Sequence, residues 1–200
     1  MTAKRRVETM EENRAKLIAS ARKAFAEKGF AAASMDDLTA SVGLTRGALY
    51  HNFGDKKGLL AAVVAQIDGE MARRAKDAAA TAGDDWEKLL AEGIAYINMA
   101  LDEEVRRIVL LDGPAFLGDP AQWPSQNSCL ESTRQSITTM LERGVIKPVD
   151  PDAAARMLNG AALNAAQCIA ASDDPQQALP KVVRVFTLLV NGLLNSSGKG

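Results

Sequence analysis

Apolar residues recur at helical spacing along most of the chain, and capping residues and helix breakers divide this pattern into segments. The first stripe runs from Leu17 to Phe25, behind the capping-box pair Thr9 and Glu12, and ends at Gly29. It predicts a helix between Thr9 and Gly29, and the fold class is all-α. The same reasoning predicts further helices over residues 35–42, 45–53, 56–76, 84–101, 105–111, 125–144, 152–171 and 181–194.

Glycine and proline interrupt the pattern in two places. Gly118, Pro120 and Pro124 predict a loop or broken helix over residues 113–124. The second interruption precedes the last helix, where an Asp-Pro pair at 174 has the form of a helix start and Pro180 follows closely. The last helix is therefore expected either to start at Pro180 or to bend there.

Two of the predicted helices are short and are joined by a sharp turn. Ser34 is placed to cap the helix over 35–42, because its hydroxyl accepts a hydrogen bond from a free amide of the first turn. Gly43 gives the backbone freedom for the exit from this helix, and Thr45 is placed to cap the next one. This order predicts a helix-turn-helix, whose second helix lies in the major groove of DNA.

The second helix carries side chains suited to that groove. The guanidinium of Arg46 has the planar shape that bonds guanine O6 and N7, and the amide of Asn52 matches adenine N6 and N7. Thr45 and Tyr50 have hydroxyl groups that donate to phosphate oxygens. The helix is therefore predicted to recognise DNA.

Small residues and a cation complete the predicted surface. Gly47 and Ala48 carry so little bulk that the backbone can approach the duplex closely. Asp55 caps the following helix, and Lys56 places a cation beside its free amides, which together form a phosphate site. The predicted DNA-binding residues are Ser34, Thr45, Arg46, Gly47, Ala48, Tyr50, His51, Asn52 and Lys56.

The run from Leu49 to Phe53, followed by Lys56 and the pair Leu59-Leu60, resembles the DNA-binding domain of the tetracycline-repressor (TetR) family. The resemblance covers residues from about 12 to 67. It implies an all-helical homodimeric transcription factor, usually a repressor, in which the residues named above lie in or beside the groove and Lys56 holds a phosphate. Asp36 departs from the pattern, because the family places a neutral or positive residue there, near the duplex.

The resemblance also implies how the chain is divided. Residues 1–56 form a three-helix helix-turn-helix domain, residues 57–79 a connecting helix, and residues 80–200 a helical-bundle domain for effector binding and dimerisation. The charge agrees with this division: the net charge is −1, but residues 1 to 60 hold 11 Lys or Arg against 7 Asp or Glu. The basic arm Lys4-Arg5-Arg6 is either a minor-groove contact or a tail without a partner.

The last helix is apolar on nearly all sides, so it must be buried on several of them. Helices 152–171 and 181–194 are predicted to pair with their copies in a second chain as a four-helix bundle. The alternative is burial inside one monomer, and the family resemblance favours the dimer. The predicted interface residues are Val182, Val185, Phe186, Leu189 and Leu193.

An effector cavity in this domain is expected to be apolar with a few polar groups. The alternative is that the amides face solvent or a partner and that the Met and aromatic residues are ordinary core. Few charged side chains interrupt the apolar stripes, so a neutral or lipophilic effector is expected. The predicted cavity residues are Met99, Phe116, Trp123, Met140, Asn159, Leu163, Asn164 and Gln167.

Catalysis is the rival class, and the sequence argues against it. The chain has one histidine, His51, which already lies on the predicted recognition helix, so no Ser-His-Asp or Cys-His site can form elsewhere. No glycine-rich phosphate loop or metal-ligand cluster is evident, and no cofactor is expected. Cys129 and Cys168 are interpreted as buried thiols in a reducing cytoplasm, and no apolar run is long enough to span a membrane.

These observations predict a cytoplasmic DNA-binding regulator that binds double-stranded operator DNA as a homodimer and is released by a small-molecule effector. The alternative function is a helical ligand-binding or scaffold protein that does not use its helix-turn-helix on DNA.

Overall fold

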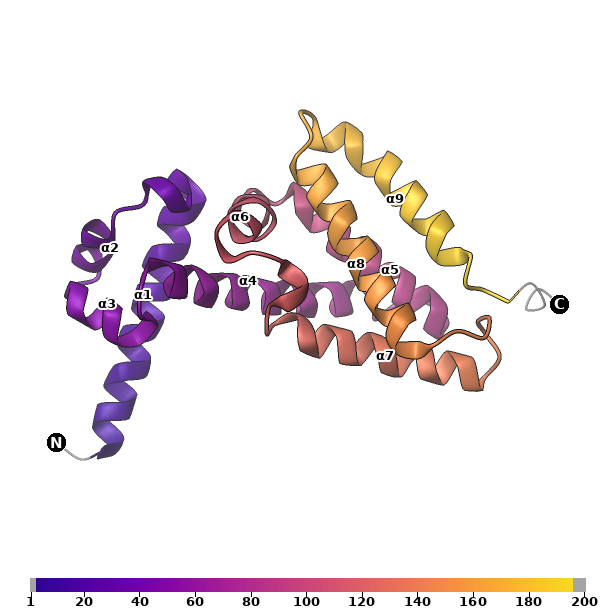
Figure 1. Ribbon diagram of the computed structural model, residues 1–200, viewed down its shortest axis with the longest axis horizontal. Coiled ribbons are helices and arrows are strands. Elements are labelled where there is room, and N and C mark those ends of the chain that lie inside the picture. The colour runs from indigo at the N-terminus through magenta and orange to yellow at the C-terminus, as the bar shows by residue number, and fades with distance from the viewer. Residues whose placement is uncertain (1–2, 196–200) are drawn as a thin grey trace.

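The computed structural model describes residues 3–195, with side chains from residue 8 onward, and no β-strand occurs in this part of the chain. Figure 1 shows an N-terminal group of helices joined by one long helix to a larger C-terminal bundle. The all-α prediction is confirmed. The first group comprises α1 (Ala3–Ala32), α2 (Met35–Ser41) and α3 (Arg46–Phe53), followed by the long helix α4 (Lys56–Ala79). The bundle comprises α5 (Asp85–Asn98), the 3₁₀ turn η1 (Met99–Leu101), the π-helix η2 (Val105–Asp112), α6 (Gly113–Leu117), the 3₁₀ turn η3 (Pro120–Gln122), α7 (Gln126–Glu142), α8 (Pro151–Ala170) and α9 (Pro175–Asn191).

Helix α1 starts earlier than its sequence pattern predicts. It begins at Ala3 rather than Thr9, because residues 3–8 contain no helix breaker. The predicted end at Gly29 is confirmed as a break, since this glycine has φ 77° and ψ 163°, a left-handed φ that favours glycine. The side chains of the basic arm, Lys4, Arg5 and Arg6, lie outside the described residues, so their proposed contact with DNA stays a prediction.

Helix α4 links the two parts of the molecule (Figure 1). Its start is fixed by Asp55, whose carboxylate accepts a hydrogen bond of 2.7 Å from the amide of Gly58. Leu59 and Leu60 are fully buried near the start of α4, and Met71 is fully buried further along it. One continuous helix therefore contributes to the packing on both sides of the junction.

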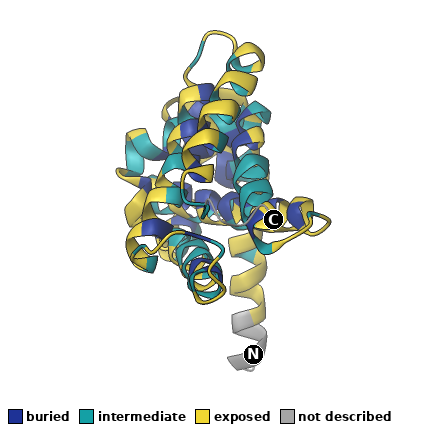
Figure 2. Cartoon of the chain, turned by 90° about the vertical axis from the view of Figure 1, so that its right-hand side faces the viewer, coloured by how far each residue is buried: buried dark blue, intermediate teal, exposed yellow. Residues whose placement is uncertain are grey.

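Aspartate caps fix the starts of three bundle helices, and the residues coloured as buried lie mainly in the interior of the molecule (Figure 2). Asp84, Asp150 and Asp174 each accept a hydrogen bond from an amide in the first turn of α5, α8 and α9. The last helix thus starts at Pro175, and Pro180 lies inside it, so neither a start at 180 nor a helix confined to 181–194 is correct. The segment over 113–124 is a broken helix, made of α6 and η3, as one of the two alternatives predicted.

Candidate DNA-binding surface and ligand cavity

The helix-turn-helix has the predicted caps. The amide of Asp37 donates to the hydroxyl of Ser34 over 3.3 Å, and the amide of Ala48 donates to the hydroxyl of Thr45 over 3.2 Å. Gly43 between the two helices has φ 67°, which supplies the sharp turn. Local side-chain to backbone bonds therefore set where α2 and α3 begin, and Gly43 allows the turn between them.

Helix α3 presents a polar face to solvent. Leu49 is fully buried against the core, whereas the ring of Tyr50 is 47% exposed. Arg46, Gly47 and His51 are exposed as well, and Ala48 is half-buried. The exposed members of the predicted DNA-binding set on α3 therefore lie on the side opposite the core, as groove contact requires.

Asp36 and Arg46 pair with each other across the two helices. The carboxylate of Asp36 lies 3.5 Å from Nε of Arg46, and both side chains are more than half exposed. An exposed pair of this kind stabilises by about 0–1 kcal/mol, so DNA can displace it. The acidic residue that departs from the family pattern thus pairs with the arginine that is predicted to contact DNA.

Asn52 and Lys56 are engaged within the protein. The Asn52 amide donates to the carbonyl of Ala48 over 2.8 Å, so it must rotate before it can reach a base. The ammonium of Lys56 donates to the carbonyl of Ala31 over 3.3 Å and lies 4.6 Å from the ring centroid of Phe30. Burial lowers the pKa of Lys56. Their contacts with DNA stay predictions.

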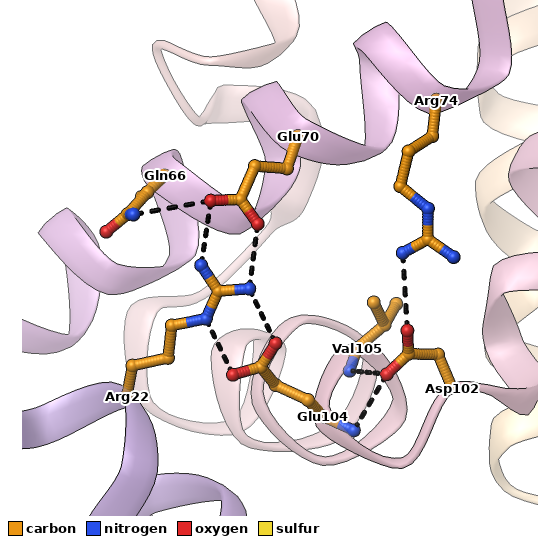
Figure 3. A network of polar contacts seen from close by, with 7 residues as sticks. All are labelled: Arg22, Gln66, Glu70, Arg74, Asp102, Glu104 and Val105. Atoms are coloured by element: carbon orange, nitrogen blue, oxygen red, sulfur yellow. Dashed lines mark hydrogen bonds and ion pairs between the residues drawn. The ribbon is translucent and has the colours of Figure 1, made fainter. Parts of the chain in front are cut away.

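A polar network that the sequence did not suggest ties the N-terminal helices to the bundle (Figure 3). The guanidinium of Arg22 on α1 donates to both oxygens of Glu70 on α4, each over 2.7 Å. It also donates to both oxygens of Glu104, over 2.6 and 2.7 Å. Gln66 donates to Glu70 over 3.3 Å, and Arg74 pairs with Asp102 at 3.2 Å. Each carboxylate thus accepts two hydrogen bonds from the guanidinium. These bonds raise the pKa of Arg22 and lower the pKa of Glu70.

The π-helix η2 forms a second link across the same junction. Asp112 at its end accepts a hydrogen bond of 2.7 Å from the amide of Phe30, just after the break in α1. Arg106 near its start donates to the carbonyl of Ala170 at the end of α8 over 3.0 Å. A π-helix widens the backbone spiral and is often found at functional positions. Here it connects the DNA-binding helices with α8.

The bundle contains a cavity of about 80 Å³ between α4, α5, α7, α8 and α9, which is partly open to solvent. Its apolar wall includes Leu89, Leu158, Ala162, Phe186 and Val190. The Phe186 ring fits there because residue 93 is glycine, since a Cβ at that position would lie 2.9 Å from Cζ of the ring. The polar residues that line the cavity are Glu92, Tyr96, Gln126, Cys129, Thr133 and Asn159.

Two of the predicted cavity residues, Asn159 and Leu163, line this cavity. The other six do not. Met99, Trp123 and Met140 are buried in the core. Phe116 packs on Phe30 at the junction, with ring centroids 4.5 Å apart. Asn164 is exposed on α8, and Gln167 is half-buried outside the lining.

Two polar residues of the cavity lining, Glu92 and Tyr96, were not among those predicted from the sequence. They are four residues apart on α5, which places them on one helix face. Asp68 of α4 is buried nearby, with its carboxylate accepting a hydrogen bond of 2.8 Å from the Gln126 amide. Burial raises the pKa of Asp68 and of Glu92. The sequence feature that could have indicated this polar lining is the four-residue spacing of Glu92 and Tyr96 among the apolar residues of α5.

An uncovered apolar surface lies on α8 and α9. Val185, Leu188 and Leu189 are 56%, 65% and 67% exposed, and Met157 of α8 is 74% exposed. Phe186 is only 5% exposed, because it points into the protomer, so its predicted place in an interface is wrong. Val182 and Leu193 are half-buried against the core of the same chain.

Other predicted features have mixed outcomes. Cys129 is half-buried and Cys168 is exposed, so the prediction of two buried thiols is wrong. Within residues 8–195, no group of His, Cys, Asp and Glu has the arrangement that holds a metal ion. Of the helices described by the structure, none has the length and apolar character needed to cross a membrane.

Comparison with known proteins agrees with this geometry. A model of bacterial regulatory proteins of the tetR family matches residues 17–63, and a tetracyclin repressor-like C-terminal domain matches residues 86–193. A solved TetR-family transcriptional regulator from Pectobacterium atrosepticum is 48% identical, with a TM-score of 0.85 and coverage of 97% of this chain and 98% of the other.

Two more distant relatives extend the comparison. The transcriptional repressor AcnR of Corynebacterium glutamicum is 26% identical over 68% of this chain and 69% of its own length. The structure of RolR in complex with resorcinol shares the fold, with 21% identity, a TM-score of 0.69 and coverage of 95% of this chain and 98% of that one. With both family models matched in order along its length, this chain belongs to the TetR family and is a transcriptional regulator that binds DNA.

Proposed function

We propose that the protein is a homodimeric cytoplasmic repressor that leaves its operator when a small molecule occupies the cavity of the bundle. The observation that carries this proposal is the course of α4 (Figure 1). Near its start, Leu59 and Leu60 are buried in the core to which α3 contributes Leu49. Further along, Ala72 and Ala75 line the cavity. A molecule that pushes on the second pair therefore displaces the helix that supports α3.

Arg22 couples this displacement to α1. Glu70, its partner on α4, lies in sequence between the part that packs beneath α3 and the part that lines the cavity. Because both oxygens of Glu70 accept hydrogen bonds from Arg22, a shift of α4 must either carry α1 along or break these bonds. The bistable element that we propose is the junction formed by Arg22, Glu70 and Glu104.

The uncovered surface of α8 and α9 supports the dimer. Met157, Val185, Leu188 and Leu189 expose large apolar side chains, and exposed patches of this kind mark protein interfaces. Two copies of the helix pair bury this surface as a four-helix bundle. The dimer then places two copies of α3 at a fixed separation, and binding to successive major grooves depends on that separation.

The mechanism that we propose is a population shift. The effector binds better to the conformation in which α4 has moved and the two copies of α3 no longer fit successive grooves. Effector and operator then weaken each other's binding by the same factor, since the coupling free energy is shared. The solved complex of RolR with resorcinol supports a small-molecule ligand in a protein of this fold.

A mobility-shift titration on the DNA upstream of the protein's own coding sequence tests the DNA-binding residues. Wild-type protein and Arg46→Ala are compared with Arg134→Ala, a matched control in which an arginine pairs with Glu131 on the bundle. We expect wild type and the control to bind alike and Arg46→Ala to bind more weakly. Equal binding by all three proteins would remove Arg46 from the recognition surface.

A further inference from the structure

The polar lining of the cavity is only partly satisfied within the protein. Oγ1 of Thr133 lies 3.0 Å from both Oδ1 of Asn159 and the carbonyl oxygen of Cys129, and its single hydrogen is shared between these two acceptors. The amide nitrogen of Asn159 has no hydrogen-bond partner among the described residues. Nε2 of Gln126 donates to Asp68, so this side chain is also held. Among the described residues, none forms a hydrogen bond with the Tyr96 hydroxyl. The cavity therefore keeps unused polar groups on the wall shared by α5 and α8.

Glu92 is the only residue with a carboxyl group in this lining, and its carboxylate is free. It has no hydrogen bond or ion pair with any residue that the structure describes. Lys76 acts on it electrostatically from α4 but does not reach ion-pair distance. A half-buried carboxylate without a donor is costly, because it has lost water and gained no hydrogen bond. Glu92 thus offers a ligand two unoccupied acceptor oxygens.

A second buried carboxyl group, that of Asp68, lies beside the cavity, whereas the charge that acts on Glu92 itself is that of Lys76. Asp68 is buried nearby and is close enough to act electrostatically on Tyr96 and Cys129, which line the same cavity. Lys76 is exposed, so solvent screens its charge from the cavity more than it screens the buried Asp68. Other lining residues, among them Leu89, Leu163 and Phe186, are apolar.

We infer that the effector is a small organic cation, with a protonated amine that donates to the carboxylate of Glu92 and an apolar body against Phe186 and Leu163. This inference rests on the proposed function, since it names the ligand class of the same cavity. It departs from the neutral or lipophilic effector that the sequence suggested. A hydrocarbon would leave the carboxylate desolvated without a partner, and a carboxylic acid would bring a second negative charge beside it.

Binding measurements with three molecules of nearly one shape test the inference. n-Butylamine, 1-butanol and butyrate share an alkyl chain that suits a cavity of about 80 Å³, and they are cationic, neutral and anionic at pH 7. We expect the amine to bind at least about tenfold more tightly than the alcohol, which corresponds to about 1.4 kcal/mol, and butyrate to bind most weakly. Titration calorimetry on the full-length protein gives the affinities.

Glu92→Gln is the decisive variant, because it keeps the shape of the side chain and removes its charge. We expect it to abolish the preference for the amine over the alcohol, whereas Glu142→Gln, an exposed glutamate at the end of α7, keeps it. An amine that binds no more tightly than the alcohol, or that keeps its advantage in Glu92→Gln, overturns the inference, as does the absence of binding by all three. If Glu92→Gln does not fold, the wild-type series decides alone.

The operator separates this inference from the proposed function. An amine that binds through Glu92 yet leaves operator affinity unchanged supports the ligand class and contradicts the switch. An alcohol that binds as tightly as the amine and releases the operator contradicts the ligand class and supports the switch.

Discussion

Replacing Arg22 by alanine removes the cation that holds α1, α4 and the start of η2 together. Its guanidinium makes four hydrogen bonds to Glu70 and Glu104, and the three side chains are only 24–30% exposed. Hydrogen bonds to charged groups contribute about 1.5–3 kcal/mol each when buried, and partial exposure reduces this figure. The substitution also leaves two carboxylates facing each other. We expect the free energy of unfolding to fall by about 2–3 kcal/mol in total.

Urea denaturation followed by circular dichroism measures this change, and the melting temperature should fall by about 4–10 °C. Arg134→Ala is the matched control, because Arg134 also pairs bidentately with a glutamate, but in solvent and one helix turn away. Its other ion pair, with Asp152 of α8 at 3.7 Å, is exposed as well. We expect no measurable change in that variant. Adding Glu104→Gln to Arg22→Ala should restore part of the loss, since it relieves the repulsion between the carboxylates.

The stability difference between wild type and Arg22→Ala should depend on pH. Arg22 holds the pKa of Glu70 below its ordinary value of 4.5. A lowered pKa means that the stabilisation is present above pH 4.5 and is lost as the pH falls through the lower, folded-state value. The difference between wild type and Arg22→Ala should therefore be largest near neutrality and shrink in acid. A loss of stability in Arg22→Ala no larger than that in Arg134→Ala, or a loss that grows in acid, would show that the Arg22 network does not stabilise the fold.

Three further predictions concern other parts of the molecule. Arg46→Ala should lose about 1–3 kcal/mol of binding free energy on the preferred operator and relax the base preference. Lys56→Ala should weaken binding to all DNA sequences alike and flatten the salt dependence of binding. Fluorescence anisotropy titrations at several salt concentrations measure both effects, and unchanged binding by either variant would contradict its prediction. Leu188→Glu should convert the dimer to a monomer in analytical ultracentrifugation, because this side chain is 65% exposed on the α9 surface, and a persisting dimer would place the interface elsewhere. Burial raises the pKa of Asp68 above 3.8, so the stability linked to its protonated form is present below that pH and is lost as the pH rises through the folded-state value. Asp68→Asn should accordingly raise the melting temperature at pH 7 by about 2–4 °C, equivalent to about 1 kcal/mol, with no gain below pH 3.8; a lower melting temperature at pH 7 would show that the charge stabilises the fold.

Local chemistry explains which parts of the fold could be predicted from sequence. Ser34, Thr45 and Asp55 cap the helices that follow them through bonds to amides three residues away, so nothing beyond the neighbouring sequence is needed. The start of α1 was missed because Thr9 and Glu12 have capping-box spacing although no breaker precedes them.

The cavity and the interface depend on how distant helices pack, which periodicity does not reveal. Helix α9 is apolar on nearly every side, so its sequence could not show that Phe186 points inward while Leu188 points outward. Glu92 acquires its role only because α4, α7 and α8 meet around α5. The Arg22 network likewise joins residues 48 and 82 positions apart in the chain.

Nuclease protection of the operator tests most directly whether a dimer reads DNA through α3. We expect two protected half-sites related by two-fold symmetry, with centres about 34–36 Å apart or at a multiple of that distance, and loss of protection in Arg46→Ala. A single protected half-site, or a protected region that is unchanged in Arg46→Ala, would contradict this expectation.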